Sequence, residues 1–233
     1  MIDRSTVIHR ALGRMRDTTY LEIGVYKGHV FLPVRARRKI AVDPRFRVLP
    51  EKKLAHLFTN PWNVFSRYLE MTSDAFFQDH GHLLERHGLS VALVDGLHTY
   101  EQALADVENC LRYLADDGLI VMHDCYPPSS AAAFRAGSFE EALEAKPEGW
   151  HGQWCGDVYK AVAHLRTRPD LEVFVLDCDM GVGVVRKAAN PRPLDMSEGD
   201  IADLSYAELR DRREELLGLV DPEAGLARLG LAP

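Results

Sequence analysis

An acid and an imidazole lie three residues apart in the stretch VALVDGLHTY, which covers residues 91–100. Asp95 follows a run of apolar residues, the pattern of a buried strand that ends in a loop. His98 precedes Thr99, which has the spacing to Gln102 of a helix capping box. A carboxylate can hold a metal ion, and an imidazole can take a proton near neutral pH. The alternative is that Asp95 caps the helix and His98 lies on its surface.

Acidic residues stand in or directly after four predicted strands. They are Glu22, Asp43, Asp95 and Asp124. Ligands of an open parallel sheet bind beyond the carboxyl ends of its strands, so we expect these acids to share one site. A solvated turn or a helix cap is the alternative for each acid taken alone. Gly24 and Gly28 follow Glu22, and glycine lets the backbone approach a ligand closely.

The spacing after the first strand favours a nucleoside-like cofactor. Asp43 comes 21 residues after Glu22, a usual distance for an acid that holds ribose hydroxyls. The three-glycine fingerprint of dinucleotide-binding proteins is missing, because Tyr26 and Lys27 intrude. We therefore expect no pyrophosphate cradle.

The elements that would position these residues alternate between strand and helix. Strands are predicted over 19–25, 39–44, 90–96, 119–124, 171–177 and 181–187, and helices over 4–16, 99–114, 138–145, 157–167 and 205–218. Residues 62–71 also match a helix with a mixed face. The pattern predicts an α/β, Rossmann-like, doubly wound fold. Its mostly parallel sheet would be closed by a C-terminal antiparallel hairpin strand.

We expect one domain over residues 1–233. It would comprise an N-terminal helix (1–18), a core (19–188) with a loop or lid at 126–155, and a helical tail (189–233). The terminal segments carry amphipathic helices that could pack on their own domain or on a second subunit. A homodimer is therefore a further prediction.

Composition limits the partners. The chain is 46% hydrophobic and has a formal net charge of −7 with no long basic run, so we expect a small-molecule substrate and no nucleic acid. No early apolar stretch reaches the length of a signal peptide or a membrane span. The four cysteines form no C-x-x-C pair, which indicates reduced thiols. A cytoplasmic location without a membrane partner is the expectation.

Five stretches carry a resemblance to a known family. They are LEIGVYKG (21–28), AVDP (41–44), VDGLHTYEQALADVENCLRYLADDGLIVMHDC (94–125), GDVYKAV (156–162) and VFVLDCDMGVGVVRK (173–187). The chain resembles the class I S-adenosylmethionine-dependent methyltransferases. It is similar in particular to bacterial metal-dependent small-molecule O-methyltransferases of the macrolide-sugar and cephalosporin-pathway type. The resemblance covers about residues 18–188 and implies a further strand near 63–72.

The resemblance implies a cofactor site for S-adenosylmethionine. The predicted cofactor-binding residues are Glu22, Gly24, Gly28, Asp43, Ser73, Asp74 and Asp95. Glu22 and the backbone at Gly24 would hold the methionine end, and Asp43 the ribose hydroxyls. Ser73 and Asp74 lie where the family contacts adenine, although Ser73–Asp74 could equally be the N-cap of a helix.

The same resemblance implies a divalent metal, Mg²⁺ or Mn²⁺, at Asp95 and Asp124. His123 would be a further ligand, at a position where relatives often carry another acid or an amide. It could instead fill the other face of its strand. His98 is then the expected catalytic base, which takes the proton of the acceptor hydroxyl.

Two other function classes stay open at this point. A nicotinamide-dependent oxidoreductase uses a similar sheet, but the missing third glycine and the lack of a Tyr-x-x-x-Lys pair count against it. A non-catalytic adenosylmethionine-binding scaffold would keep the fold and the cofactor without turnover.

Overall fold

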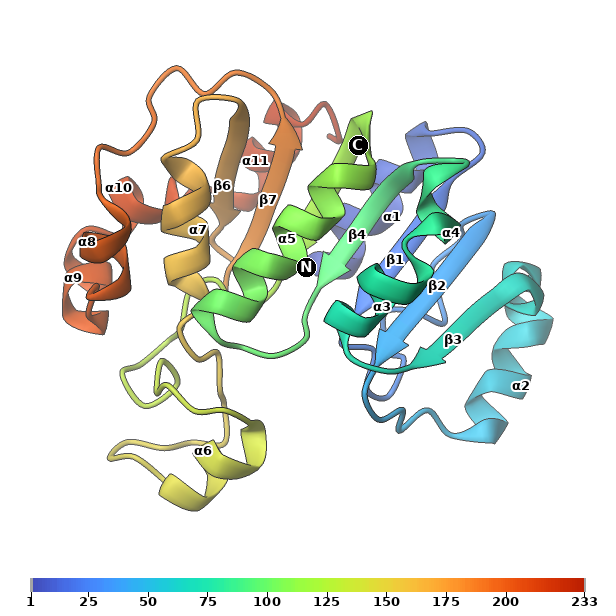
Figure 1. Cartoon of the computed structure of the whole chain (residues 1–233), viewed down its shortest axis with the longest axis horizontal. Coiled ribbons are helices and arrows are strands. Elements are labelled where there is room, and N and C mark those ends of the chain that lie inside the picture. Colours follow the sequence, from blue (N-terminus) through green and yellow to red (C-terminus); the bar gives the residue numbers. More distant parts are fainter. Residues whose placement is uncertain (1, 233) are drawn as a thin grey trace. The chain divides into compact units, whose positions relative to one another are not determined.

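The computed structural model describes residues 2–232 and contains a seven-stranded sheet (Figure 1). Its strands are β1 (Thr19–Ile23), β2 (Arg38–Asp43), β3 (Ser66–Glu70), β4 (Leu89–Val94), β5 (Leu114–Met122), β6 (Leu171–Leu176) and β7 (Val182–Lys187). The strand order is β3-β2-β1-β4-β5-β7-β6. β1 pairs in parallel with β2 and β4, β2 pairs in parallel with β3, and β6 pairs antiparallel with β7. The predicted Rossmann-like sheet with its antiparallel hairpin is confirmed.

Helical segments connect the strands. They are α1 (Arg4–Arg14), α2 (Pro50–Thr59), the 3₁₀ turn η1 (Pro61–Phe65), α3 (Ser73–His80), α4 (His82–Glu85), α5 (Tyr100–Tyr113), α6 (Phe139–Ala145), α7 (Val158–Arg166), α8 (Glu198–Ala202), α9 (Tyr206–Asp211), α10 (Arg213–Leu217) and α11 (Pro222–Arg228). Among the residues that the structure describes, no helix is long and apolar enough to cross a membrane.

The chain divides into two compact units. The first, here called the N-terminal unit, contains Ser5–Gly96 and Asp106–Val121. The C-terminal unit contains the residues up to Arg4, Leu97–Ala105 and the chain from Met122 onward. All seven predicted cofactor-binding residues belong to the N-terminal unit, whereas His98, His123 and Asp124 belong to the C-terminal unit.

Residues 62–71 do not form the helix that their mixed pattern suggested. η1 ends at Phe65, and Ser66–Glu70 is β3, which pairs in register with Lys39–Asp43 of β2. Pairing with a neighbouring strand satisfies the backbone groups here, a tertiary effect that local periodicity does not encode. The strand that the family resemblance implied near 63–72 is thus confirmed.

Two other boundaries differ from the prediction. The helix expected over 205–218 is two helices, because the backbone of Arg212 leaves the helical region at φ −122° and ψ 23°. β5 begins at Leu114, five residues before the predicted start at 119. The short helix predicted over 138–145 is present as α6 (Phe139–Ala145), capped by Ser138.

A lysine is buried in the core of the N-terminal unit. Lys39 of β2 is 1% exposed, and its Nζ donates to the Phe31 carbonyl and to Asn63 Oδ1, both at 2.5 Å. The ammonium also lies 4.4 Å from the centre of the Phe31 ring. Burial lowers the pKa of Lys39 to about 7, against the opposing effect of Glu22. Folding therefore favours the neutral amine at mildly alkaline pH.

Lys39→Met should remove a pH dependence of stability. The folded pKa of about 7 lies below the ordinary value of 10.5, so between these pH values the unfolded chain binds more protons. Wild-type stability relative to the variant should therefore rise as pH increases from about 7 to about 9. Urea unfolding at both pH values measures the difference. Lys52→Met, at an exposed lysine, is the matched control, and a pH-independent difference for Lys39→Met would contradict the assignment.

Candidate active site

The loop after β1 depends on a glycine. Gly24 has φ +87°, and a Cβ atom there would lie 1.8 Å from the carbonyl oxygen of Asp95. Its N–H donates to the Val42 carbonyl at 2.9 Å, while the Asp95 N–H donates to the Ile23 carbonyl at 2.9 Å. The backbones that leave β1, β2 and β4 thus meet at Gly24, where no side chain fits.

Asp43, the last residue of β2, fixes the same loop. Its Oδ2 accepts from the N–H of Tyr26 and its Oδ1 from the N–H of Arg45, both at 2.7 Å. Tyr26 has a left-handed backbone, with φ +47°. A carboxylate has about four lone-pair positions, so Asp43 retains acceptor capacity beyond these two bonds. Gly28 closes the turn by donating to the Val25 carbonyl at 2.8 Å.

Glu22 is the fourth of the five residues of the buried strand β1. It is 2% exposed, and its Oε2 accepts from the Tyr20 hydroxyl at 2.5 Å. Ser73 and Asp74 begin α3, and Ser73 is 7% exposed. The N-cap of α3 is Thr72, whose hydroxyl accepts from the Ala75 N–H, so the structural role considered for Ser73–Asp74 belongs to Thr72.

His98 and Asp124 lie side by side in the C-terminal unit. His98 Nδ1 lies 3.0 Å from the Trp154 carbonyl, and its Nε2 lies 3.4 Å from Asp124 Oδ2. A carbonyl only accepts, so Nδ1 carries the ring proton and Nε2 turns toward the acid. The helix cap here is Thr99, whose hydroxyl accepts from the Gln102 N–H at 3.4 Å.

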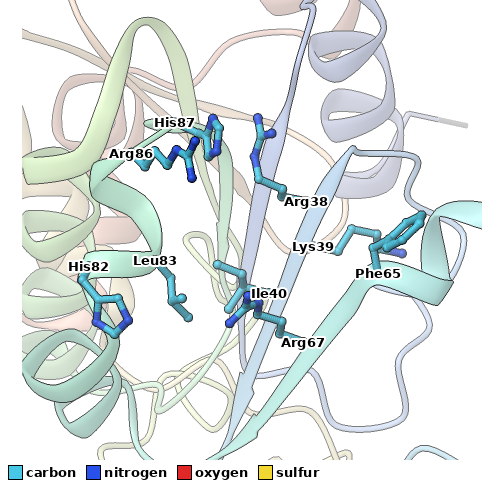
Figure 2. Close-up of a pocket in the computed structure, with 9 residues that line it drawn as sticks. All are labelled: Arg38, Lys39, Ile40, Phe65, Arg67, His82, Leu83, Arg86 and His87. Atoms are coloured by element: carbon cyan, nitrogen blue, oxygen red, sulfur yellow. The ribbon is translucent and has the colours of Figure 1, made fainter.

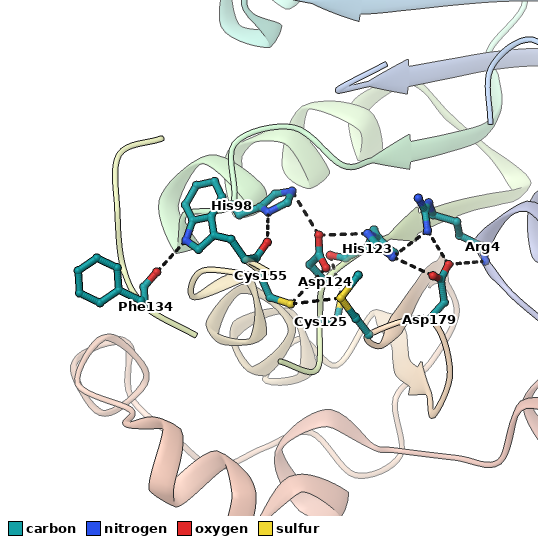
Figure 3. A network of polar contacts seen from close by, with 10 residues as sticks. Arg4, His98, His123, Asp124, Cys125, Phe134, Cys155 and Asp179 are labelled. Carbon is teal, nitrogen blue, oxygen red and sulfur yellow. Dashed lines mark hydrogen bonds and ion pairs between the residues drawn. The ribbon is translucent and has the colours of Figure 1, made fainter. Parts of the chain in front are cut away.

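Asp124 is a buried carboxylate with a left-handed backbone. Its side chain is 4% exposed, and φ is +58°. Oδ1 accepts from the Cys155 thiol at 3.2 Å, and Oδ2 lies 3.1 Å from His123 Nδ1 (Figure 3). Non-glycine residues persist in this backbone region where their surroundings hold them, often at functional sites.

His123 points toward acids and does not merely fill a strand face. Its Nε2 lies 2.9 Å from Arg4 Nη1 and 3.4 Å from Asp179 Oδ1. The Asp124 carboxylate only accepts, so Nδ1 donates to it, while Nε2 faces both the Arg4 guanidinium and the Asp179 carboxylate. Burial raises the pKa of Asp179, but His123 and Arg4 outweigh it and bring the value to about 2. Figure 3 shows the resulting chain of contacts from His98 to Arg4.

The predicted lid, residues 126–155, is tied to His98. The rings of His98 and Trp154 are 5.0 Å apart, and the Trp154 indole donates to the Phe134 carbonyl at 2.8 Å. Gly156 follows directly, with φ +57°. Asp157, 2% exposed, accepts from the Tyr100 N–H at 2.7 Å and so joins the base of the lid to the start of α5.

Four residues of this network were missed from the sequence: Arg4, Arg135, Cys155 and Asp179. Arg135 binds Asp157 at 2.7 Å and Glu101 at 2.9 Å, which secures the lid. Asp179 lies in the turn between β6 and β7, where the sequence revealed only hairpin spacing. No local pattern in the sequence pairs this turn with Arg4, 175 residues away.

The sequence of residues 21–125 matches a protein family described as a methyltransferase domain. That segment reaches from β1 through β5 and contains every predicted site residue. The matched segment spans 105 of the 233 residues, and over it the chain is similar to methyltransferases. The match confirms the resemblance to class I S-adenosylmethionine-dependent methyltransferases and the enzyme class predicted from it.

Solved structures share the fold of this chain. A Klebsiella pneumoniae protein assigned as an O-methyltransferase is 12% identical, with 80% of each chain covered and a TM-score of 0.56. The cofactor-bound protein Rv0187 from MTB is 11% identical, with 82% of this chain and 83% of that chain covered and a TM-score of 0.56. At these identities the likeness is one of fold. A search of curated proteins finds no match.

Gly156→Ala should displace His98 from its position beside the lid. A Cβ atom at Gly156 would lie 1.8 Å from the His98 carbonyl oxygen, whereas none of the described atoms lies within 4 Å at Gly152. Both glycines have positive φ, so Gly152→Ala is the matched control for backbone strain, worth ~1 kcal/mol. Gly156→Ala should cost at least ~1 kcal/mol more, because backbone must move, and should also slow methyl transfer. Denaturant unfolding and rate measurements check this; equal effects of the two variants would contradict it.

Proposed function

We propose that this chain transfers a methyl group from S-adenosylmethionine to a hydroxyl of a small molecule. The observation that carries the proposal is the loop after β1, where Gly24 allows three strand ends to meet beside Glu22 and Asp43. Such a junction at the carboxyl ends of parallel strands is where sheets of this type bind nucleoside cofactors. The matched methyltransferase family favours this reading over a nicotinamide-dependent oxidoreductase.

The geometry of the N-terminal unit is compatible with the cofactor roles that the resemblance implies. The Asp43 carboxylate is anchored by two backbone N–H groups and keeps lone pairs for the ribose hydroxyls. Glu22 and the Gly24 backbone would receive the methionine end, whose ammonium group complements a buried carboxylate. Ser73 and Asp74, at the start of α3, remain the proposed adenine contacts. Gly28 and Asp95 complete the proposed set.

His98 is the proposed base. Methyl transfer to a hydroxyl oxygen releases the hydroxyl proton, and His98 would accept that proton at Nε2. Its Nδ1 proton is held by the Trp154 carbonyl, which fixes the tautomer and the ring orientation. Asp124, 3.4 Å from Nε2, would stabilise the imidazolium that forms. Trp154, whose ring lies 5.0 Å from that of His98 at a tilt of 30°, would limit the access of water.

A divalent metal is the proposed aid to the reaction. When bound, it would lower the pKa of the acceptor hydroxyl. With the proton on Nδ1, a neutral His98 presents a lone pair to the Asp124 carboxylate at 3.4 Å, an arrangement that suits a shared proton or a cation. Asp95 remains a proposed metal ligand because it directly follows β4. His123 uses both ring nitrogens on Arg4 and Asp124, so it fits better as the residue that orients Asp124.

Three further expectations remain proposals. A homodimer built on the terminal segments, a cytoplasmic location and the absence of a nucleic-acid partner rest on the sequence arguments above. A scaffold that binds S-adenosylmethionine without turnover is the second candidate function. The acid–imidazole network around His98 favours an enzyme, because a scaffold does not require a base with a fixed tautomer.

Calorimetry should show binding of S-adenosylmethionine and S-adenosylhomocysteine but not of NADH. Asp43→Ala should weaken S-adenosylmethionine binding by at least ~1 kcal/mol, about fivefold in Kd, because the ribose hydroxyls lose their acceptor. Asp79→Ala, at an exposed acid of α3, is the matched control. Unchanged affinity for Asp43→Ala, with the fold intact by circular dichroism, would reject the assignment.

Treatment with a chelator should abolish methyl transfer, and Mg²⁺ or Mn²⁺ should restore it. Asp124→Asn removes the charge that would neutralise the cation, so metal affinity and turnover should fall together while S-adenosylmethionine still binds. His98→Ala should retain metal and cofactor yet lose ~100-fold in rate, with a smaller loss at high pH, where the acceptor ionises unaided. Activity that survives chelation would reject a role for the metal. An active His98→Ala variant would reject His98 as the base.

A further inference from the structure

The segment between β2 and β3 exposes its apolar side chains. None of the residues in α2 is buried. Exposed apolar residues of α2 and η1, here called the apolar face, are Leu54, Leu57, Phe58, Trp62, Val64 and Phe65. Phe58 is 82% and Phe65 68% exposed. So many large apolar side chains in a stretch of twelve residues indicate a surface that another body covers.

Polar side chains anchor the segment from inside. Asn60 is 2% exposed, and its Nδ2 donates to the carbonyls of Leu32 and Val34 at 3.0 and 2.7 Å. Asn63 is 7% exposed; it donates to the Leu32 carbonyl and accepts from Lys39 Nζ. The usual arrangement, apolar inside and polar outside, is thus reversed here.

The apolar side chains form stripes along the two helical pieces. In α2, Leu54, Leu57 and Phe58 have the i, i+3, i+4 spacing of one helix face. In a 3₁₀ helix, residues three apart eclipse each other, so Trp62 and Phe65 form one ridge of η1 while Asn60 and Asn63 share another. The inward ridge anchors the segment, and the outward ridge continues the exposed apolar surface.

The charge around this face is opposite to that of the whole chain. Residues 25–69 contain ten Lys and Arg against two Asp and Glu, although the chain has a net charge of −7. Lys52 and Lys53 precede the stripe within α2 itself. A short amphipathic helix with lysines beside Leu and Phe is typical of segments that lie in the interface of a membrane.

A cavity of about 300 Å³ adds cations beside the apolar face (Figure 2). Phe65 lines it together with Arg38, Arg67 and Arg86. Asp17 pairs with Arg38 at 3.0 Å, whereas no described residue forms an ion pair or hydrogen bond with the side chain of Arg67 or Arg86. Two guanidinium groups are therefore available for phosphate, which they bind well in bidentate geometry.

We propose that the apolar face docks this protein on a membrane surface that contains anionic phospholipids. The apolar side chains would enter the acyl boundary, and Lys52, Arg67 and Arg86 would meet the phosphates. A second copy is a poorer occupant, because a two-fold interface would place the basic surface against itself. Protein interfaces are also depleted in lysine. Nucleic acid binds to basic and aromatic side chains, so it would leave Leu54 and Leu57 without a contact.

This inference goes beyond methyl transfer and revises the expectation of no membrane partner. That expectation came from the absence of a spanning segment in the sequence. Interfacial binding needs no span, only an exposed amphipathic surface with basic residues. A small-molecule acceptor that partitions into lipid would then be concentrated at the enzyme.

Vesicle sedimentation tests the proposal on the full chain. The protein should sediment with vesicles of phosphatidylglycerol and phosphatidylcholine but not with phosphatidylcholine alone, and salt should weaken binding. Phe58→Ser should reduce binding about tenfold, and Lys52→Glu at least about fivefold. Phe139→Ser, at a 44% exposed phenylalanine of α6, is the matched control and should bind as the wild type does.

Three results would overturn the proposal. They are no sedimentation with anionic vesicles, equal sedimentation with neutral vesicles, and an equal loss in the Phe139→Ser control. Light scattering supplies a further check, because a mass halved by Phe58→Ser would assign the face to a second copy. Binding to single-stranded RNA in the absence of vesicle binding would assign it to nucleic acid. Failure of methyl transfer would leave these measurements unaffected.

Discussion

A buried carboxylate organises the C-terminal unit. Asp124 is almost fully removed from water, and a charge in that position is tolerated only when hydrogen-bond donors surround it. The neighbouring His123 donates to Oδ2, and the thiol of Cys155, 31 residues along the chain, donates to Oδ1. His98, from the loop before α5, also faces Oδ2. Because the buried Asp124 carboxylate requires hydrogen-bond donors, its surroundings bring together the segments that carry His98, His123 and Cys155.

The N-terminal unit obeys a steric constraint of the same importance. Where Gly24 leaves β1, the Asp95 backbone occupies the space of a side chain, so the strand ends approach one another more closely than any other residue would allow. Asp43 then holds the loop through two backbone N–H groups. A junction fixed by backbone contacts would keep its shape while the side chains around it bind the proposed cofactor.

The segment from α2 to η1 is held in place by hydrogen bonds and not by burial of apolar side chains. Asn60 and Asn63 attach it through amide hydrogen bonds to the backbone, and Lys39 donates to Asn63 from the core. Hydrogen bonds of this kind need little apolar contact, so the leucines and phenylalanines of the apolar face can stay exposed. In this region the fold is therefore held without burial of the apolar face.

The sequence alone determined the strand–helix alternation, the glycine after β1 and the acids at the strand ends, because periodicity and turn residues are local properties. Family resemblance added β3, whose own pattern suggested a helix. Tertiary structure decided the rest. Only folding brings Arg4 to Asp179 and the Trp154 carbonyl to His98, and the carbonyl that selects the His98 tautomer lies 56 residues away in the chain. Sequence spacing carries no record of such contacts, since they depend on how the elements pack.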